Sequence, residues 1–543
     1  MSNENGSNGS NGSNGSNGSN GSTGGRSFFR AKALETGRHE SFRQALEGEY
    51  VFRIDRGGKP PFDTYNAATG ELQNMIRACV AENKPLRAHG SLWSLSTVAV
   101  NDGRLIDNTA LRLAFEVPGA LTDPAYTARG GDAARLRFVE CGNSVAVLNE
   151  YLFAQGLSIK GCGSNNGQTV AGAVSTGTHG GGYRFGAMQE MVVGLHLVTG
   201  PDRHVYLERK TSPVMHAGFA QSIGAEFIRD DTLFNAALVS LGSFGIIHGV
   251  MIETRELFLL NAVRFRHPYD TALKAAIAAC DPTLIPLPAE ADAVPRDKPY
   301  HFELFFNPNE GTPPAEAILL IMYESAFDPD HYDPPPWNAG EPGLGASGLD
   351  IMGALVGRIP SPLNKVAVPL LNAQVNQEFA PYFKQAVIRD LFRGEKTLGG
   401  TLACGVGMPL KHAVEAMEIA FRVYKDSDAV LPLILSHRFV KGTHALLGFT
   451  RFDTTAVMEM DAVNTAQTRA YFERVWDALD AAGVPFTLHW GKYNAFLTPE
   501  RVRNRYGDAA VDQWLASRKT LLPDPQVRRI FNNDFMRRVG LVN

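Results

Sequence analysis

Residues 167–182 read GQTVAGAVSTGTHGGG, and this stretch indicates more about the fold than any other part of the chain. Six of its sixteen positions are glycine, and most of the others are small or carry a hydroxyl group. Glycine has no Cβ, so such a backbone can lie against a ligand, and its N–H groups can bind phosphate. The alternative is a glycine-rich loop that holds no ligand. The neighbouring motifs favour the first interpretation.

Three other motifs accompany this stretch in a fixed order along the chain. RAHGSLWSLS (87–96) precedes it, and LFNAALVSLGSFGIIHGVMIE (233–253) and HWGKYN (489–494) follow it. A Rossmann fingerprint needs G-x-G-x-x-G after a strand, whereas the nearest candidate, which begins at Gly161, is spaced G-x-G-x-x-x-G. Walker A, HExxH and G-x-S-x-G motifs are absent from the sequence. Phosphoryl transfer, metal-dependent hydrolysis and serine-hydrolase chemistry therefore have no support.

The four motifs together resemble the vanillyl-alcohol-oxidase-type flavoproteins, which carry a PCMH-type FAD domain, and within them the aldonolactone and alditol oxidases. The resemblance is dense over residues 50–255 and rests on isolated motifs elsewhere. The tail IFNNDFMRRVGL (530–541) is also similar to that of the flavin-linked cholesterol oxidase. The fold implied is α+β: a PCMH-type FAD-binding domain of two α+β subdomains, plus a substrate-binding cap domain with an antiparallel sheet backed by helices.

The resemblance implies a set of FAD contacts, mostly from backbone N–H groups. The turn after the first motif's strand is expected to bind the pyrophosphate, and the second motif to line the diphosphate and the flavin edge. The implied cofactor-binding residues are Ala88, His89, Gly90, Ser91, Leu92, Trp93 and Ser94, then Gly172, Ala173, Thr178, Gly180 and Gly181, then Ala187 and Met188, and finally Ile247 beside the adenine.

One departure from the family concerns how the FAD is held. Many relatives carry a histidine bonded covalently to the flavin in the first motif, and Trp93 stands at that place. An indole cannot form that link, and Cys162 lies several residues too early to serve as the second type of covalent handle. We therefore expect non-covalent FAD.

The reacting centre is expected from the second half of the chain. In the aldonolactone and alditol oxidases a Glu-x-Arg strand and the lysine of HWGK surround the substrate hydroxyl, and here these positions read Ser436-His437-Arg438 and Lys492. Alcohol oxidation removes the hydroxyl proton while a hydride leaves carbon for flavin N5, and a cation beside the oxygen stabilises the developing alkoxide. Arg438 and Lys492 can supply that cation. Ser436 in place of the glutamate weakens the inference of a polyol or sugar-lactone substrate.

The identity of the proton acceptor stays open at this point. His437 and His489 are candidates, but side chains alternate along a strand, so His437 and Arg438 cannot both face the site. We favour Arg438 inward. Glu303 and Asn494 are candidate substrate contacts, with a sheet-edge carboxylate and a loop cap as the respective alternatives.

The pattern of elements predicts four segments. Residues 1–26 are an Asn/Gly/Ser repeat expected to be disordered, 27–255 the FAD-binding domain, 256–490 the substrate domain, and 491–543 a helical segment that returns to the FAD domain. Expected strands in the second half include 301–308, 318–325, 431–442 and 444–452, with helices at 412–426 and 465–483.

Composition limits the classes of partner. The 543 residues carry a formal charge of −4, and no basic run with interleaved aromatics suggests nucleic acid. The five cysteines are scattered, so we expect no metal site, and no apolar run is long enough to span a membrane. The expectation is a cytoplasmic FAD-dependent oxidase of a small-molecule alcohol that uses dioxygen. The alternatives are a flavin dehydrogenase with another electron acceptor, oxidation of a C–N or other activated C–H bond, and a flavin-binding protein without activity.

Overall fold

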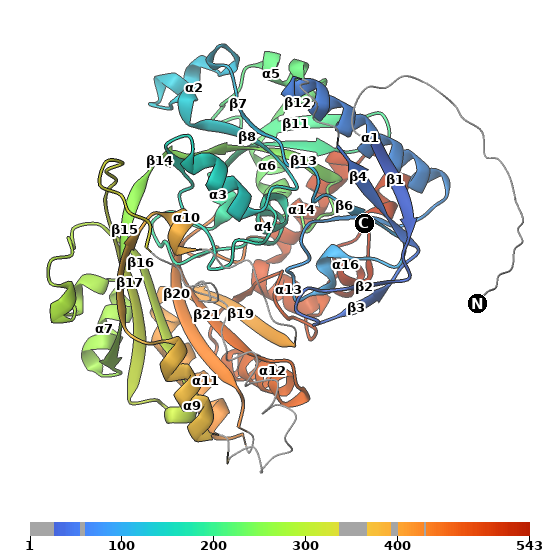
Figure 1. The fold of residues 1–543 in the computed structure, drawn as a ribbon. Helices are drawn as coiled ribbons and strands as arrows, with labels where there is room; N and C mark the ends of the chain where they lie inside the picture. Colours follow the sequence, from blue (N-terminus) through green and yellow to red (C-terminus); the bar gives the residue numbers. More distant parts are fainter. Residues whose placement is uncertain (1–25, 55–59, 336–365, 367, 393–399, 428–429) are drawn as a thin grey trace, which may run out of the picture.

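The computed structural model describes residues 26–54, 60–335, 366, 368–392, 400–427 and 430–543 (Figure 1). The expected tail 1–26 lies outside these residues except for Arg26, and so does the larger part of the Pro/Gly-rich stretch 327–345. The fold is α+β, as predicted, and its helices and sheets form two halves with the C-terminal helices beside the first.

The first half begins with a four-stranded sheet that ends in the turn of the first motif. Its order is β1-β4-β6-β5, antiparallel between β1 and β4 and parallel elsewhere. Helix α1 (Pro61–Ala81) starts with proline at its first position and buries Leu72, Met75, Ile76 and Cys79, which lie at helical spacing. The strands are β1 (Arg26–Ala31), β4 (Gly48–Arg53), β5 (Leu86–His89) and β6 (Arg104–Asp107).

A six-stranded sheet completes the first half, in the order β12-β11-β10-β13-β8-β7. Strands β10 and β11 form an antiparallel hairpin around GPDR (200–203). The strands are β7 (Ala114–Glu116), β8 (Leu136–Glu140), β10 (Val192–Val198), β11 (His204–Glu208), β12 (Glu226–Arg229) and β13 (Ile246–Glu253), and the helices include α2 (Pro124–Ala128), α3 (Val145–Phe153), α4 (Val170–Thr176), α5 (Ala217–Ser222) and α6 (Asp231–Leu238).

The second half is an eight-stranded antiparallel sheet, in the order β18-β15-β17-β16-β20-β21-β19-β22, with helices packed along it (Figure 1). Its central strands are buried almost throughout, which explains their continuous apolar sequences. The strands are β15 (Phe258–Pro268), β16 (Pro299–Phe306), β17 (Glu316–Ala326), β18 (Tyr382–Ala386), β19 (Thr401–Pro409), β20 (Leu433–Lys441), β21 (Thr454–Val463) and β22 (Thr487–Leu488), and the helices are α7 (Thr271–Ala279), α9 (Val368–Glu378), α10 (Ile388–Leu391), α11 (Ala413–Lys425) and α12 (Ala466–Ala481).

The C-terminal helices return to the first half of the chain (Figure 1). Trp514 Nε1 donates to Val239 O at 3.1 Å, and Asn533 Nδ2 donates to Val100 O at 2.7 Å. The C-terminal segment thus contacts residues 100 and 239 of the first half. The domain boundaries stay a prediction. The helices are α13 (Pro499–Tyr506), α14 (Asp508–Leu521), α15 (Pro525–Ile530) and α16 (Asp534–Arg538).

One predicted strand, at 444–452, is wrong, and the neighbouring strand β21 was missed. Residues 444–452 form turns, because Gly448 N–H donates to Ala445 O at 3.0 Å and Thr443 N–H donates to Thr450 O at 2.8 Å. These short-range bonds fold the segment back on itself, so the next ten residues pair with β20 instead. The other strands and helices named above for the second half are confirmed within a few residues.

Candidate active site

The four sequence motifs, far apart in the chain, meet in one place. Arg87 of the first motif donates from Nη1 to Gly242 O of the third at 2.6 Å. Leu95 N–H donates to Gly491 O at 2.7 Å, which joins the first motif to HWGK. A Cβ added to Gly90 would overlap Thr169, so only glycine lets this turn approach the second motif. The motifs therefore build a single site between the two halves.

The turn after β5 presents unused backbone donors. In the part of the chain that the structure describes, the N–H groups of Ser91, Leu92, Trp93 and Ser94 donate to no protein acceptor. Leu92 has φ +54°, in the left-handed region, which places the turn in a conformation that a leucine rarely adopts. A run of free N–H groups at a strained turn suits an anionic group such as a pyrophosphate.

The second motif forms helix α4 and the glycine-rich segment after it. The helix ends at Gly177, whose φ of +72° closes the left-handed cap. A Cβ at Gly180 would overlap the Cys162 carbonyl, and one at Gly181 would overlap the His301 ring. These two glycines therefore allow the protein to pack against itself, a role the sequence did not reveal. The N–H groups of His179, Gly180 and Gly181 make no hydrogen bond to protein among the described residues, so they too remain available to a ligand.

The weaker cofactor candidates occupy buried positions around α4. Met188 N–H donates to Thr178 O at 2.9 Å, which fixes the segment after the motif. Ala187 is buried in a small cluster with Phe449. Ile247 lies on β13 directly after the third motif's turn and is 7% exposed. Ala88 lies on β5, directly before the donor-rich turn. Gly172 and Ala173 lie in α4, which precedes the glycine-rich segment, with Gly172 in its first turn.

Charged side chains from three neighbouring strands and the HWGK turn form one buried network. Glu459 on β21 binds Lys492 Nζ through Oε1 at 2.6 Å and Arg438 Nη2 through Oε2 at 3.3 Å. Arg438 also pairs with Glu303 on β16 through a short contact from Nε. Asp461, two residues after Glu459, lies 3.4 Å from Lys492 Nζ and faces solvent with nearly half its side chain. Of the predicted site residues, Lys492, Arg438 and Glu303 are thus brought together.

Two histidines join the network from the side of the second motif. His301 Nε2 donates to Glu303 Oε2 at 2.9 Å, and its Nδ1 is buried without a partner. His179 Nε2 lies 3.6 Å from Glu459 Oε1, while its Nδ1 donates to Gly180 O at 2.9 Å. The glycine-rich segment therefore lies directly against the ion network.

Opposite charges hold the network in its ionised form. Burial would raise the pKa of Glu459, but the charges of Lys492 and Arg438 outweigh it and hold that pKa well below its usual range. Burial likewise opposes ionisation of Glu303, and Arg438 outweighs it and lowers the pKa. For Lys492, burial lowers the pKa while Asp461 and Glu459 raise it, with a net rise. At neutral pH the site therefore holds two cations, and Glu459 and Glu303 are charged.

The two candidate proton-accepting histidines lie in different surroundings. His437 lies on the other face of β20 from Arg438, as strand alternation predicted, and burial lowers its pKa to about 3. His489 Nδ1 accepts Gly491 N–H at 3.1 Å, so the neutral ring carries its hydrogen on Nε2. Burial and then His179 lower the pKa of His489 well below the usual range. His437 therefore faces away from Arg438, and the lone pair of the neutral His489 ring is already used by Gly491 N–H.

Asn494 is committed to the loop and to the C-terminal helix. Its Nδ2 donates to Trp490 O at 3.3 Å, and its Oδ1 accepts from Arg538 Nη2 at 3.2 Å. Both ends of the amide are used, which favours the loop-cap alternative. Ser436 is fully buried, and its hydroxyl has no hydrogen-bond partner in the part of the chain that the structure describes.

Sequence reasoning missed the most connected residue of the site, Glu459. The signal that would have revealed it is a pair of acids, Glu459 and Asp461, two positions apart within the apolar run TTAVMEMDAV. Residues two apart on a strand share a face, and a buried carboxylate needs a partner. His301 was missed as well, although it stands two residues before the predicted Glu303.

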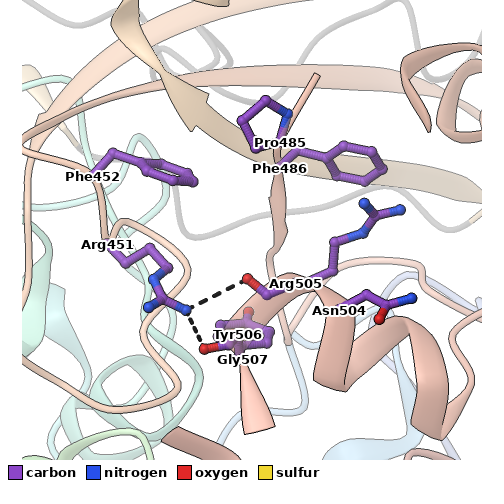
Figure 2. A pocket seen from close by; sticks show the side chains of 8 residues that line it. All are labelled: Arg451, Phe452, Pro485, Phe486, Asn504, Arg505, Tyr506 and Gly507. Atoms are coloured by element: carbon purple, nitrogen blue, oxygen red, sulfur yellow. Dashed lines mark hydrogen bonds between the residues drawn. The ribbon is translucent and has the colours of Figure 1, made fainter. Parts of the chain in front are cut away.

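A cavity of about 270 Å³ is lined by residues 451–452, 485–486 and 504–507, and none of the predicted site residues lines it (Figure 2). Its wall includes Tyr506, whose ring stacks on Trp490 with centroids 5.2 Å apart. Arg451 donates across it to the carbonyls of Arg505 and Tyr506, as the dashed lines in Figure 2 show. Arg451 therefore closes the end of α13 and does not point to the flavin-side motifs.

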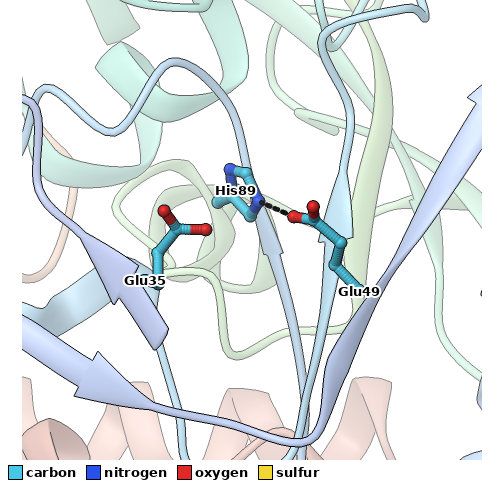
Figure 3. A group of neighbouring side chains, drawn as sticks. All are labelled: Glu35, Glu49 and His89. Atoms are coloured by element: carbon cyan, nitrogen blue, oxygen red, sulfur yellow. Dashed lines mark ion pairs between the residues drawn. The ribbon is translucent and has the colours of Figure 1, made fainter. Parts of the chain in front are cut away.

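His89, a predicted cofactor contact, instead belongs to a buried acidic cluster with Glu35 and Glu49 (Figure 3). Its Nε2 is 3.8 Å from Glu49 Oε2, and its Nδ1 donates to Gly90 O at 2.7 Å. A His and two carboxylates could hold a metal ion, but Lys32 Nζ already lies 2.6 Å from Glu35 and 3.1 Å from Glu49. The Lys32 ammonium group supplies the positive charge that the two carboxylates need. His89 holds the start of the donor-rich turn through its hydrogen bond to Gly90 O.

Comparison with known proteins identifies the domain that carries the first two motifs. Residues 65–206 match the family described as FAD binding domain. The chain is 25% identical to L-gulono-1,4-lactone dehydrogenase of Mycobacterium tuberculosis (strain ATCC 25618 / H37Rv) over 472 residues, 86% of this chain and 93% of that protein. It is 30% identical to D-arabinono-1,4-lactone oxidase of Saccharomyces cerevisiae over 228 residues, 41% of this chain and 38% of that protein.

Solved structures share the whole fold at low sequence identity. Cholesterol oxidase from Brevibacterium sterolicum superposes with a TM-score of 0.63 at 13% identity, over 95% of this chain and 97% of that one. Xylooligosaccharide oxidase from Myceliophthora thermophila superposes with a TM-score of 0.56 at 10% identity, over 92% and 93% of the two chains. No helix among the described residues is both long and apolar enough to cross a membrane.

Proposed function

The chain contains an FAD-binding domain, and we propose that it is an FAD-dependent oxidoreductase that oxidises a hydroxyl-bearing carbon of a sugar-derived lactone or polyol. The observation that carries the proposal is the Glu459-centred ion network, which lies against the glycine-rich segment of the FAD-binding domain. When bound, FAD supplies the two-electron acceptor for such a reaction.

The donor-rich turn and the glycine-rich segment are proposed to hold the FAD. Ser91 to Ser94 and His179 to Gly181 offer backbone N–H groups that no protein acceptor among the described residues uses. Backbone donors of this kind bind a pyrophosphate without adding a charged side chain. The residues present therefore fit the cofactor that the domain is built to bind.

Lys492 and Arg438 are proposed to act on the substrate oxygen. Both cations bind Glu459, and they are only 20% and 11% exposed, so their charges are weakly screened. A fixed cation beside a developing alkoxide stabilises the transition state more than the neutral alcohol. The raised pKa of Lys492 keeps it an ammonium group, which assigns it to charge stabilisation and not to proton removal.

Glu459 is proposed to receive the hydroxyl proton. His437 lies on the opposite face of the strand, and the Nδ1 of His489 is already an acceptor for Gly491 N–H. The low pKa of Glu459 depends on the charge of Lys492. When Lys492 also interacts with the substrate oxygen, its charge stabilises the Glu459 carboxylate less, so the proton affinity of Glu459 rises.

The substrate class follows from the polarity of the site and the relatives. Donors and acceptors alternate along Lys492, Glu459, Arg438 and Glu303, an arrangement that suits a neutral molecule rich in hydroxyl groups. Two relatives are named for L-gulono-1,4-lactone and D-arabinono-1,4-lactone. The objection raised by Ser436 no longer stands, because Glu459 supplies a carboxylate at the same level of the sheet.

Dioxygen is the proposed electron acceptor, with another acceptor as the second candidate. Relatives named oxidases favour dioxygen, and the relative aligned over most of both chains is named a dehydrogenase, which favours the second. The two differ in whether reduced flavin persists in air.

The deciding experiment is anaerobic titration of the holoprotein with L-gulono-1,4-lactone, D-arabinono-1,4-lactone, a polyol and cholesterol. Loss of the oxidised flavin absorbance with a lactone or polyol, but not with cholesterol, supports the proposal. Admission of air then separates the acceptors: prompt reoxidation with hydrogen peroxide indicates dioxygen. Bound flavin that none of these compounds reduces would indicate a flavin-binding protein without this activity.

A further inference from the structure

Trp93, which stands where relatives carry a covalent flavin link, lies in a tight enclosure. Its side chain fills the space that a Cβ at Gly167 would need, so the second motif forms one wall against the indole. The residue is 9% exposed, and its Nε1 has no hydrogen-bond partner among the described residues. The proposed function uses the backbone of this turn but leaves the indole without a role.

A hairpin from the N-terminal part of the chain forms the other wall. Strands β2 (Leu34–Thr36) and β3 (Arg43–Ala45) pair in antiparallel register, and their connection reaches the donor-rich turn. Arg38 N–H donates to Leu92 O at 3.0 Å, and Arg38 Nε donates to Ser91 O at 3.2 Å. The Arg38 guanidinium lies 5.3 Å from the centre of the Trp93 ring. One arginine thus binds both the backbone and the indole of the turn.

The same hairpin is attached to the substrate sheet through the next residue. His39 meets Trp93 edge-on, with ring centroids 5.5 Å apart, and its Nδ1 lies 3.0 Å from Thr401 Oγ1 at the start of β19. Gly400 N–H donates to His39 O at 3.0 Å. Burial and the positive charge of Lys492 lower the pKa of His39 to about 4, so its ring is neutral at physiological pH.

From these contacts we propose that hairpin 34–45 is a clasp that retains non-covalent FAD, with Arg38 and His39 as positioning residues for Trp93 and its turn. The clasp joins the turn that binds the cofactor to the strand that borders the ion network, so the two halves of the site cannot separate while it is closed. It takes the place of the covalent bond used by relatives. The proposal rests on the FAD binding of the proposed function.

The geometry also indicates why arginine serves at position 38. A planar guanidinium can stack on an indole while its edge donates to a carbonyl, whereas a lysine ammonium cannot do both. Arg43, on strand β3 of the same hairpin, is exposed and has no contact with Trp93 among those of the described residues. It provides a matched control of the same residue type in the same element.

The test measures the rate at which full-length holoprotein releases FAD after dilution, from the recovery of free FAD fluorescence. Arg38→Ala, Arg38→Lys and His39→Ala are expected to release FAD about tenfold faster than the parent protein, and Arg43→Ala at the parent rate. The thermal midpoint of the FAD-free protein is measured for each variant. It should fall by less than the thermal midpoint of the holoprotein, because retained FAD adds stability to the holoprotein alone.

Release rates within twofold of the parent for both Arg38→Ala and His39→Ala would overturn the clasp. A fall in the thermal midpoint of the FAD-free protein as large as that of the holoprotein would also overturn it, since that result indicates a hairpin with a structural role only. A parent protein that takes up no FAD would overturn the proposed function itself, so the two failures are distinguishable.

Discussion

Glu459 on β21 is the register partner of Ser436 on β20. The family to which the motifs point places a glutamate two residues before the arginine on one strand, and this chain has serine there. The neighbouring strand supplies the carboxylate instead, at the same level of the sheet and within 3.3 Å of Arg438. A carboxylate on a different strand can serve the same pair of cations because adjacent strands lie only about 4.8 Å apart.

Replacement of Glu459 with Gln is expected to lower kcat about 10²- to 10³-fold, because it removes the proposed proton acceptor and the partner of two cations. Stopped-flow reduction of the flavin by substrate measures this step directly. Glu324→Gln is the control, since Glu324 lies in the same sheet but pairs with Arg255. Equal flavin reduction rates in the two variants would remove Glu459 from the mechanism.

Lys492→Met is expected to lower kcat/KM about 10²- to 10³-fold, while Lys492→Arg retains part of the activity because it keeps the charge. The pKa of Lys492 is raised above its ordinary value of 10.5, so its charge persists through neutral and moderately alkaline pH. The pH–rate profile of the parent protein and that of Lys492→Arg should therefore have the same shape below about pH 10. Full activity of Lys492→Met would refute the assignment.

His437 should make the fold sensitive to acid. Its ring is neutral in the folded protein, with a pKa of about 3 against an ordinary value of 6.5, because it is buried. The unfolded chain therefore binds the proton first, and stability is lost as the pH falls from about 6.5 toward 3. His437→Leu should reduce the difference in unfolding free energy between pH 6.5 and 4.5 by about 2–3 kcal/mol. Urea titrations at the two pH values measure it, and exposed His331→Gln should change nothing.

Two glycine substitutions should have opposite effects. A Cβ at Gly180 would overlap the backbone carbonyl of Cys162, which cannot move aside, so Gly180→Ala should cost about 2 kcal/mol or more and weaken FAD binding. Gly70 lies inside α1 with no atom near its would-be Cβ, so Gly70→Ala should stabilise the protein by about 0.5–1 kcal/mol. Thermal unfolding with and without FAD measures both. A tolerated Gly180→Ala would contradict the packing described for the second motif.

The flavin should leave the protein when the protein is precipitated with acid. Trp93 occupies the position of the linking histidine and offers no nitrogen lone pair for a bond to the flavin. Trichloroacetic acid precipitation followed by absorbance of the supernatant provides the measurement. A yellow pellet after washing would show a covalent link at some other residue.

The order of the four motifs was sufficient to predict the fold, because these motifs are local in sequence and together resemble those of one flavoprotein family. Arg438 and Lys492 were predictable as part of the site because each lies in one of the motifs, and strand alternation placed His437 on the far face. Glu459 was not, because its role depends on which strand pairs with β20. That pairing depends on turns at 443–450, whose apolar sequence is typical of a strand.

Two further contacts could not be predicted for the same reason. The glycines at 180 and 181, predicted to approach a ligand, also make room for the Cys162 carbonyl and the His301 ring, which come from distant segments. His89, predicted to contact the cofactor, also lies in a cluster that includes Glu35 from the hairpin. In both cases the partner lies far away in sequence, and no local pattern identifies it.

The hydrogen bond from Leu95 to Gly491, and those from Asn533 to residues 97–100, bear on when the protein can mature. The ribosome makes the donor-rich turn about four hundred residues before the segments that hold it from behind. A nascent chain therefore carries the cofactor motifs long before it can form the cofactor site. The site is therefore complete only after residues 491 and 533 have been made, and the motifs of the first half do not build it alone.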